Sequence, residues 1–506
     1  MIARILTFPL ILILAGMAAI LMLLPTIDAL MRDDTSVARA FGYSAILGMA
    51  AVMIVGLAMS GGGRREVSDS QNLVSLLLAY LILPLYLAVP FYEGVGNTTF
   101  LNAYFEMVSS FTTTGATLFG ATGRLVDSLH LWRALVGWGG GLLIWISASA
   151  VLAPLNLGGF EVTARAEPGQ DDTRVGRFQR ANPAKRLAQV TAGLAPVYIG
   201  LTGALWVILM MGGERAFVAM VHAMSTMATS GISSIGGLQN GAAGFGGEFA
   251  VFLFLLFALS RLTFSSDTIT SARPGVFYDP EFRLGVTLVI GVPLVLVLRH
   301  WIAAFETVEA DNIAVGLRAF WGGMFTVLSF LSTTGFESAD WQAARDWSGL
   351  GTPGLVLLGL SLVGGGVATT AGGVKLLRVY ALYLHGKREV ERLVHPSSVG
   401  RSTGAGRRIR RHGAYIAWIF FMLFALSLTF VTLLLAAFGQ DFESSLILAI
   451  SGLSTTGPLI ISASEAPIRL LDLSAGAKLL YGAAMVLGRL ETLAMIALLN
   501  PAVWRD

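Results

Sequence analysis

The stretch Phe111-Thr112-Thr113-Thr114-Gly115-Ala116 recurs three more times in nearly the same form. The other copies are Met-Ala-Thr-Ser-Gly-Ile at 227–232, Leu-Ser-Thr-Thr-Gly-Phe at 331–336 and Leu-Ser-Thr-Thr-Gly-Pro at 453–458. The motif glycines are separated by 116, 104 and 122 residues. Such near-regular self-similarity indicates internal duplication, so we expect four copies of one structural unit.

Each motif ends an apolar run of about a dozen residues, which is too short to cross a bilayer and is typical of a re-entrant helix. These runs lie at roughly 101–112, 216–228, 318–331 and 442–453. Longer apolar segments flank them. Each unit is therefore predicted to contain a spanning helix, a short re-entrant helix, a Thr-Thr/Ser-Gly loop and a second spanning helix.

The composition identifies a membrane protein. Of the 506 residues, 55% are hydrophobic and only 13% are charged, too few to cover a soluble surface of this size. Ten segments are long enough to span, with a requirement of roughly 20 residues each. They lie near 5–25, 39–60, 72–92, 131–155, 187–212, 246–266, 283–305, 352–384, 413–438 and 476–499.

Basic residues orient these helices. The loop at 159–186 carries six Lys and Arg, the loop at 386–411 carries eight, and Arg64 and Arg65 follow the second segment. With ten crossings all three loops fall on the side of both termini, which the positive-inside rule makes cytoplasmic. We therefore expect a multi-pass protein of a bacterial cytoplasmic membrane, with its four motifs on the outer side.

The motif residues suit a monovalent cation. Glycine allows backbone angles that turn successive carbonyls toward one axis, and small hydroxyl residues leave the path open. Four such loops can replace the hydration shell of K⁺, and none contains the carboxylate that a divalent ion favours. The predicted K⁺ ligands are Thr113, Thr114, Gly115, Ala116, Thr229, Ser230, Gly231, Ile232, Thr333, Thr334, Gly335, Phe336, Thr455, Thr456, Gly457 and Pro458.

Acidic residues near the outer ends of the units are compatible with cation attraction or with an ordinary solvated rim. They are Glu93, Glu306, Glu309, Asp311, Glu337, Asp340, Asp441 and Glu443.

The eighth segment contains a break that predicts a gate. Five glycines and two threonines within residues 364–373 make a poor helix interior, so we expect an intramembrane loop below the third motif. Close helix packing is the alternative use of these glycines. The segment fits neither a Walker loop nor a dinucleotide fingerprint. The candidate gate residues are Gly364, Gly365, Gly366, Thr369, Thr370, Gly372, Gly373, Lys375 and Arg489.

Arg489 lies within the last predicted span, where a charge costs about 2.5–3.5 kcal/mol on insertion scales. It is expected to face the pore or a carbonyl partner, or else to pair with an acidic group on another helix. Lys375 either anchors the glycine-rich loop or marks the cytoplasmic side. The six histidines have no metal-ligand spacing, and we expect no cofactor and no enzymatic activity.

These residues resemble the Trk/Ktr superfamily of potassium transporters, and within it the TrkH subgroup, over essentially the whole chain. The resemblance rests on residues 105–117, on Trp132-Arg133 with the glycine-rich stretch 137–141, on Thr369 to Lys375 and on Gly488-Arg489-Leu490-Glu491. It implies four fused channel-like repeats, a gating loop, a homodimer and a cytosolic nucleotide-binding regulatory partner. Glycine in all four loops goes with K⁺ preference in this family.

The expected fold is all-α, with ten transmembrane helices and four re-entrant pore helices. Residues 1–68 hold two extra helices, and the four repeats occupy 69–158, 159–270, 271–400 and 401–506. The expected function is K⁺ uptake, with Rb⁺ as a possible substitute, by gated conduction through a selectivity filter. The alternative is a secondary transporter that couples K⁺ to H⁺ or Na⁺, which would normally use a carboxylate near the midplane.

Overall fold

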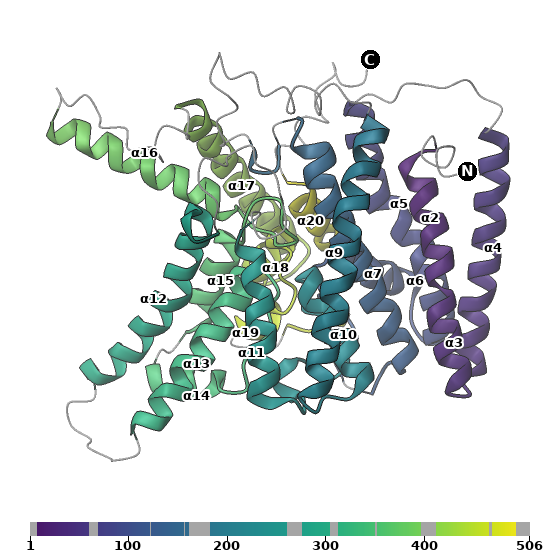
Figure 1. Ribbon diagram of the computed structural model, residues 1–506, viewed down its shortest axis with the longest axis horizontal. Helices are drawn as coiled ribbons and strands as arrows, with labels where there is room; N and C mark the ends of the chain where they lie inside the picture. The colour runs from purple at the N-terminus through teal and green to yellow at the C-terminus, as the bar shows by residue number, and fades with distance from the viewer. Residues whose placement is uncertain are drawn as a thin grey trace.

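The computed structural model describes residues 8–59, 69–121, 123–155, 157–160, 183–260, 276–303, 312–349, 352–395, 411–464 and 468–491. Within these ranges all regular structure is helical, and most long helices run side by side (Figure 1). Arg64, Arg65, most basic residues of the two large loops, and the acidic residues Glu306, Glu309 and Asp311 lie outside the described residues.

Eight helices are long and apolar enough to cross a membrane. Seven of them coincide with predicted spans. They are α2–α3 (Leu10–Leu21 and Leu23–Met31), α4 (Thr35–Met59), α5 (Asp69–Val95), α7 with its π-helical end η1 (Asp127–Ser147 and Ala148–Leu152), α9 (Pro183–Met211), α12 (Pro280–Ala303) and α17 (Arg411–Ala437). The fold is that of a multi-pass membrane protein.

The eighth long helix is α13 (Asn312–Leu331), where the sequence predicted a re-entrant helix of only 318–331. The predicted run begins at Arg318, the one charged residue of α13. Arg318 is exposed in the structure, so its charge does not end the helix, and the apolar residues before it add more than one turn. The other three motifs follow the short helices α6 (Phe100–Phe111), α10 (Ala216–Ala228) and α18 (Phe442–Ser454), and these three with residues 318–331 of α13 correspond to the four predicted short helices.

Three predicted spans are shorter helices in the described residues. They are α11 with η4 (Gly244–Leu255 and Leu256–Leu259), α15 (Gly354–Val363) and α20 (Ala475–Leu490). The predicted segment 352–384 is divided: α15 ends before Gly364, and α16 (Leu376–Val394) begins after the glycine-rich stretch. In Figure 1, α16 projects sideways from the other helices. The short helices α14 (Trp341–Ser348) and α19 (Leu459–Ser462) follow the third and fourth motifs.

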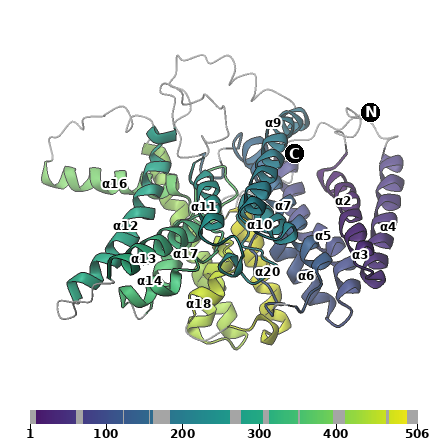
Figure 2. The same cartoon turned by 60° about the horizontal axis from the view of Figure 1, so that its bottom comes forward.

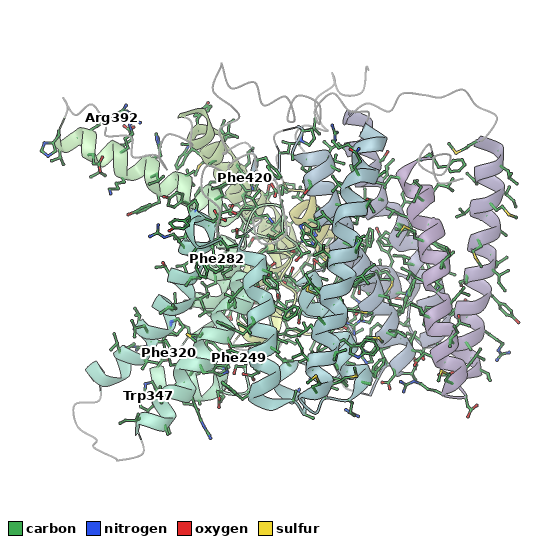
Figure 3. All side chains as sticks on the ribbon, in the orientation of Figure 1. Phe249, Phe282, Phe320, Trp347, Arg392 and Phe420 are labelled. Carbon is green, nitrogen blue, oxygen red and sulfur yellow. The ribbon has the colours of Figure 1, made fainter. Side chains whose placement is uncertain are left out.

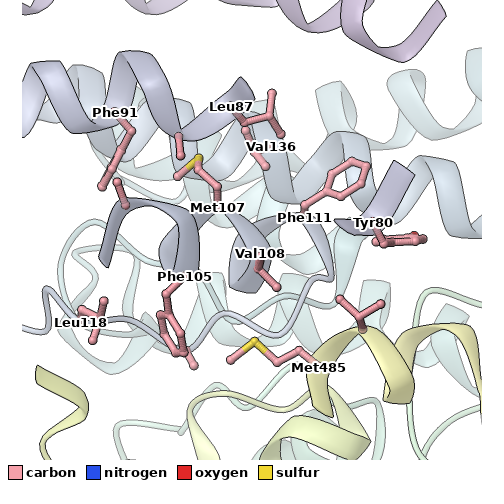
Figure 4. Packing of buried hydrophobic residues seen from close by; sticks show 14 of the residues in the cluster. Tyr80, Leu87, Phe91, Phe105, Met107, Val108, Phe111, Leu118, Val136 and Met485 are labelled. Atoms are coloured by element: carbon pink, nitrogen blue, oxygen red, sulfur yellow. The ribbon is translucent and has the colours of Figure 1, made fainter. Parts of the chain in front are cut away.

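The buried apolar side chains form two large clusters. The first packs α6 between α5, α7 and α20, with Phe105 and Val108 of α6 facing Met485 of α20 and Phe111 packed on Tyr80 of α5 (Figure 4). The second joins helices of the second and third repeats with α18. Figure 2 shows α18 and α20 beside the helices of the earlier repeats, so the two ends of the duplicated region meet. This packing brings the ends of the four short helices together.

Candidate functional site

The four motif loops share one backbone geometry at the helix end. After α6, α10, α13 and α18, the residue two positions before each motif glycine adopts a left-handed conformation that is uncommon outside glycine. Thr113, Thr229, Thr333 and Thr455 have φ of 56°, 49°, 60° and 56°. All four are almost fully buried. The chain therefore turns in the same way at the end of each short helix.

A repeated serine closes each turn. It stands six residues before the motif glycine, and its carbonyl accepts a hydrogen bond of 2.9 Å from the N–H of the residue before that glycine. The four serines are Ser109, Ser225, Ser329 and Ser451. The sequence analysis missed this position, although aligning the four motifs at their glycines would have revealed it.

The motif glycines bring the loops together in a closed ring. A Cβ atom on Gly115 would lie 1.8 Å from the carbonyl oxygen of Ser230 in the second loop, and one on Gly231 would lie 2.2 Å from that of Thr334 in the third. The ring continues through the two remaining glycines. A Cβ on Gly335 would lie 2.9 Å from Pro458 in the fourth loop, and one on Gly457 would lie 2.1 Å from Ala116 N in the first. No side chain fits at these four contacts without displacement of the neighbouring loop.

Three of the four loops are tied to their own helix by a second repeated position, nine residues before the glycine. Glu106 Oε2 accepts from Leu118 N at 3.0 Å, and His222 Nε2 lies 2.9 Å from Ser233 Oγ. Thr326 Oγ1 accepts from Ser338 N at 3.3 Å. In the fourth repeat this position is Leu448, which offers no polar group. The same alignment of motifs would have predicted the tether in three repeats and its loss in the fourth.

Buried charges support the outer parts of the loops. Glu106 forms an ion pair of 2.6 Å with Arg133 of α7, and both side chains are at most 3% exposed. Glu248 of α11 reaches across to the third loop, where it accepts from Ala339 N at 2.6 Å and Ser338 Oγ at 2.7 Å. Burial of such carboxylates is favourable only when they are paired in this way. Neither residue was singled out as a site residue from the sequence.

Two of the outer acidic residues, Asp441 and Glu93, differ in their surroundings. Asp441 caps the first turn of α18 by accepting from Ser444 N at 3.0 Å, and this hydrogen bond lowers the pKa of Asp441. Glu93 is exposed. The former is therefore structural, and the latter stays a candidate for the acidic rim.

The glycine-rich segment is a loop that contacts the inner ends of three motif loops. Thr370 Oγ1 lies 3.1 Å from Thr229 Oγ1 of the second motif, and Gly372 N donates to Thr333 Oγ1 of the third at 2.8 Å. A Cβ on Gly372 would lie 2.2 Å from the Ser454 carbonyl oxygen beside the fourth. The loop therefore lies directly across the C-terminal ends of the short helices.

The two ends of this loop are held together at glycines. A Cβ on Gly364 would lie 2.2 Å from the Gly372 carbonyl oxygen, and one on Gly373 would lie 2.7 Å from Gly364 Cα. Gly365 and Gly366 pack against the backbone of residues 258–260. Close packing and loop formation, the two uses that the sequence left open, therefore occur in the same segment.

Two candidate gate cations contact the loop directly. Arg489 Nη1 donates to the Thr370 carbonyl at 2.7 Å, and Lys375 Nζ donates to the Ala371 carbonyl. Arg489 thus has the carbonyl partner that was one of its predicted environments. The acidic residue near it, Glu491, instead pairs with Arg378 at 2.6 Å. Two cavities flank the loop and share Ala368 and Thr369 in their walls.

The long apolar helices and the ring of buried loops define a multi-pass membrane transport protein. A family model described as TrkH, cation transport protein, matches residues 250–503. The chain belongs to the TrkH cation transport family, which confirms the resemblance, and it is a transport protein and not an enzyme.

The similar proteins cover nearly the whole chain. The Trk system potassium uptake protein TrkH of Salmonella typhimurium is 29% identical and covers 96% of each chain. That of Vibrio parahaemolyticus is 28% identical and covers 88% of each. The crystal structure of the potassium transporter TrkH from Vibrio parahaemolyticus matches 100% of both chains, with a TM-score of 0.80 and 25% identity.

Proposed function

We propose that this chain takes up K⁺ across a bacterial cytoplasmic membrane by gated conduction through the ring of four motif loops. The observation that carries the proposal is the closed ring, in which each motif glycine faces the next loop in chain order. Rings of neutral backbone oxygens are a known means of replacing the hydration shell of K⁺. The names of the relatives, potassium uptake proteins, support the same ion.

The filter consists of the carbonyls and hydroxyls of residues 113–116, 229–232, 333–336 and 455–458. The C-terminal ends of the four short helices carry partial negative charge next to the ring and favour a cation there. In this arrangement the chain has ten membrane crossings, two before the first repeat and two in each repeat, and both termini are cytoplasmic. α13 serves as the third pore helix despite its length, because it ends at the same motif as α6, α10 and α18.

Conduction without a second ion is the first test. Purified protein in liposomes, with a Rb⁺ gradient and no H⁺ or Na⁺ gradient, is expected to take up ⁸⁶Rb⁺. Addition of a proton ionophore should leave the initial rate unchanged, and liposomes without protein provide the background. Uptake that requires an imposed H⁺ or Na⁺ gradient would instead support coupled secondary transport.

The glycine-rich loop is the gate in this proposal, and Arg489 holds it closed. The hydrogen bond from Arg489 to the Thr370 carbonyl ties the loop across the ring, and the positive charge repels K⁺ on the same path. A hydrogen bond that involves a charged group contributes about 1.5 kcal/mol or more, which is about tenfold in an equilibrium.

Replacing Arg489 by alanine should therefore raise ⁸⁶Rb⁺ uptake up to about tenfold per molecule of protein in the membrane. Arg392→Ala is the control, because Arg392 lies near the far end of α16 and, within the described residues, pairs only with the exposed Glu389 (Figure 3). Uptake by Arg489→Ala at or below the level of the unmodified protein would contradict this role.

The homodimer and the cytosolic nucleotide-binding regulatory subunit stay predictions that rest on the family resemblance. A dimer is tested by the mass of the purified protein in detergent, measured by light scattering. The regulatory subunit is tested by co-purification from the native membrane.

A further inference from the structure

The fourth motif loop differs from the other three in its backbone. Gly115, Gly231 and Gly335 have φ of 74°, 66° and 82°, whereas Gly457 lies outside the left-handed region. Gly457 precedes Pro458, and a residue before proline is pushed toward extended angles. The chain then enters α19 immediately after Pro458. The sequence itself therefore distinguishes the fourth loop.

The carbonyl and the N–H of the peptide between Thr456 and Gly457 bind groups in two different parts of the structure. Its carbonyl oxygen, on Thr456, accepts a hydrogen bond of 2.9 Å from Ser451 Oγ in α18 and a longer one of 3.3 Å from Leu459 N at the start of α19. Its N–H, on Gly457, donates to the Thr114 carbonyl of the first loop at 2.6 Å. The carbonyl is thus turned into the fourth repeat's own helix, and the N–H is turned toward the ring.

The repeated serine makes a different contact in each repeat. In the first, Ser109 Oγ donates to the carbonyl of Ala116, after the motif glycine, at 2.6 Å. In the second, Ser225 Oγ lies 3.1 Å from Ser230 Oγ. In the third, Ser329 Oγ has no hydrogen-bond partner among the described residues. In this part of the chain, only Ser451 binds the carbonyl immediately before its motif glycine.

Tyr481 of α20 fixes the direction of the Ser451 hydroxyl. Tyr481 Oη lies 2.7 Å from Ser451 Oγ, and both side chains are fully buried. Ser451 has one hydroxyl proton, which goes to the Thr456 carbonyl, so the tyrosine hydroxyl is the donor to Ser451. Chains of hydrogen bonds of this kind reinforce one another in a buried site.

We infer that Ser451 and Tyr481 are positioning residues that hold the Thr456–Gly457 peptide with its carbonyl turned away from the ring and thereby limit conduction. The inference rests on the proposed filter. Two of the four carbonyls that precede the motif glycines are engaged in this orientation: Thr456 O by Ser451, and Thr114 O by Gly457 N–H. The carbonyls of Ser230 and Thr334 accept no hydrogen bond within the described residues. Release of the peptide restores two oxygen ligands for K⁺ and removes an N–H dipole that repels it.

The fourth loop can turn because it lacks the tether of the other three. Leu448 replaces Glu106, His222 and Thr326 at the position that ties the outgoing chain to its own helix. The orientation of this peptide therefore depends on the Ser451–Tyr481 pair, on Pro458 and on the longer hydrogen bond from Leu459 N.

The test is ⁸⁶Rb⁺ uptake into liposomes by Ser451→Ala, Tyr481→Phe and the double variant. Loss of one hydrogen bond of ordinary strength should raise uptake by about 2- to 10-fold in each single variant. Because Tyr481 acts through Ser451, the double variant should equal Ser451→Ala, whereas two independent packing defects would add. Ser445→Ala is the control: Ser445 is equally buried in α18, and among the residues that the structure describes its hydroxyl bonds only to the Gln440 carbonyl, at 3.5 Å.

Uptake by both single variants at or below the unmodified level would overturn the inference. Tyr481→Phe keeps the ring that packs on Phe105, so it decides the question if Ser451→Ala does not fold. Gly115→Ser, measured alongside, distinguishes failure of the positioning role from failure of the proposed filter. If Gly115→Ser alters ion selectivity while the Ser451 and Tyr481 variants change nothing, the filter stands and only the positioning role fails. If Gly115→Ser is also without effect, the proposed filter itself fails.

Discussion

Replacing Gly115 by serine is expected to lower the preference for K⁺ over Na⁺ by about 100-fold or more. Gly115 has φ of 74°, and a Cβ atom there would lie 1.8 Å from the Ser230 carbonyl oxygen. The strained backbone costs on the order of 1–3 kcal/mol, and the second loop must also move. Each 1.4 kcal/mol is a factor of ten, so misplacing the ligands of two loops accounts for a change of this size.

The measurement is the ratio of ⁸⁶Rb⁺ to ²²Na⁺ uptake in a strain without other K⁺ uptake systems. Gly120→Ser is the matched control. Gly120 lies five residues after Gly115 and is exposed, and no atom lies within 4 Å of its Cβ position. The control should keep the ratio of the unmodified protein. An unchanged ratio in Gly115→Ser would remove the first loop from the selectivity filter.

Replacing Arg133 by methionine is expected to destabilise the protein by about 3–5 kcal/mol. This change leaves Glu106 as a buried carboxylate without its partner, and removal of one member of a buried ion pair has a cost of this order. Methionine is flexible and apolar and fills much of the same space, so the cost comes mainly from the unpaired charge. Glu106 also holds Leu118 N, so the first loop should lose its outer support and its K⁺ selectivity.

Chemical denaturation in detergent micelles measures the change in the free energy of unfolding. The double variant Arg133→Met/Glu106→Gln should recover part of the loss, because a neutral amide oxygen can still accept from Leu118 N. Arg392→Gln breaks an exposed pair on α16 and should cost at most about 1 kcal/mol. A cost below that level for Arg133→Met would mean that the pair is not needed for stability.

The parts of the fold that are marked by a local sequence pattern could be predicted from the sequence. The four Thr-Thr/Ser-Gly motifs, their apolar helices and the glycine-rich break are local patterns, and all of them correspond to structural elements. The length of α13 could not be predicted from hydropathy alone, because Arg318 is a charge on an exposed helix side and not a boundary. The division of 352–384 was predicted as a loop over residues 364–373; α15 ends at Val363 as expected, and α16 begins at Leu376, two residues later than expected.

The tertiary contacts of the site were beyond local patterns. Glu248 lies in one repeat and binds the next, and no spacing in the sequence connects it to Ala339. Arg489 was expected to find either a carbonyl or an acidic partner, and only the packing of α20 against the glycine-rich loop decides for Thr370. The orientation of the peptide at Gly457 depends on its sequence neighbour Pro458 and on the distant Tyr481. Only the effect of Pro458 could be predicted from the sequence.

Glu248 also has a consequence for the order in which the protein is made. A chain grows and is inserted from its N-terminus, so α11 emerges before residues 338 and 339 exist. Glu248 is therefore synthesised before Ser338 and Ala339, the two residues of the third loop that it binds. A nascent chain arrested after α11 therefore contains Glu248 but not yet residues 338 and 339, which Glu248 binds in the folded protein. During biogenesis the second repeat therefore presents a binding group for the third before the third is made.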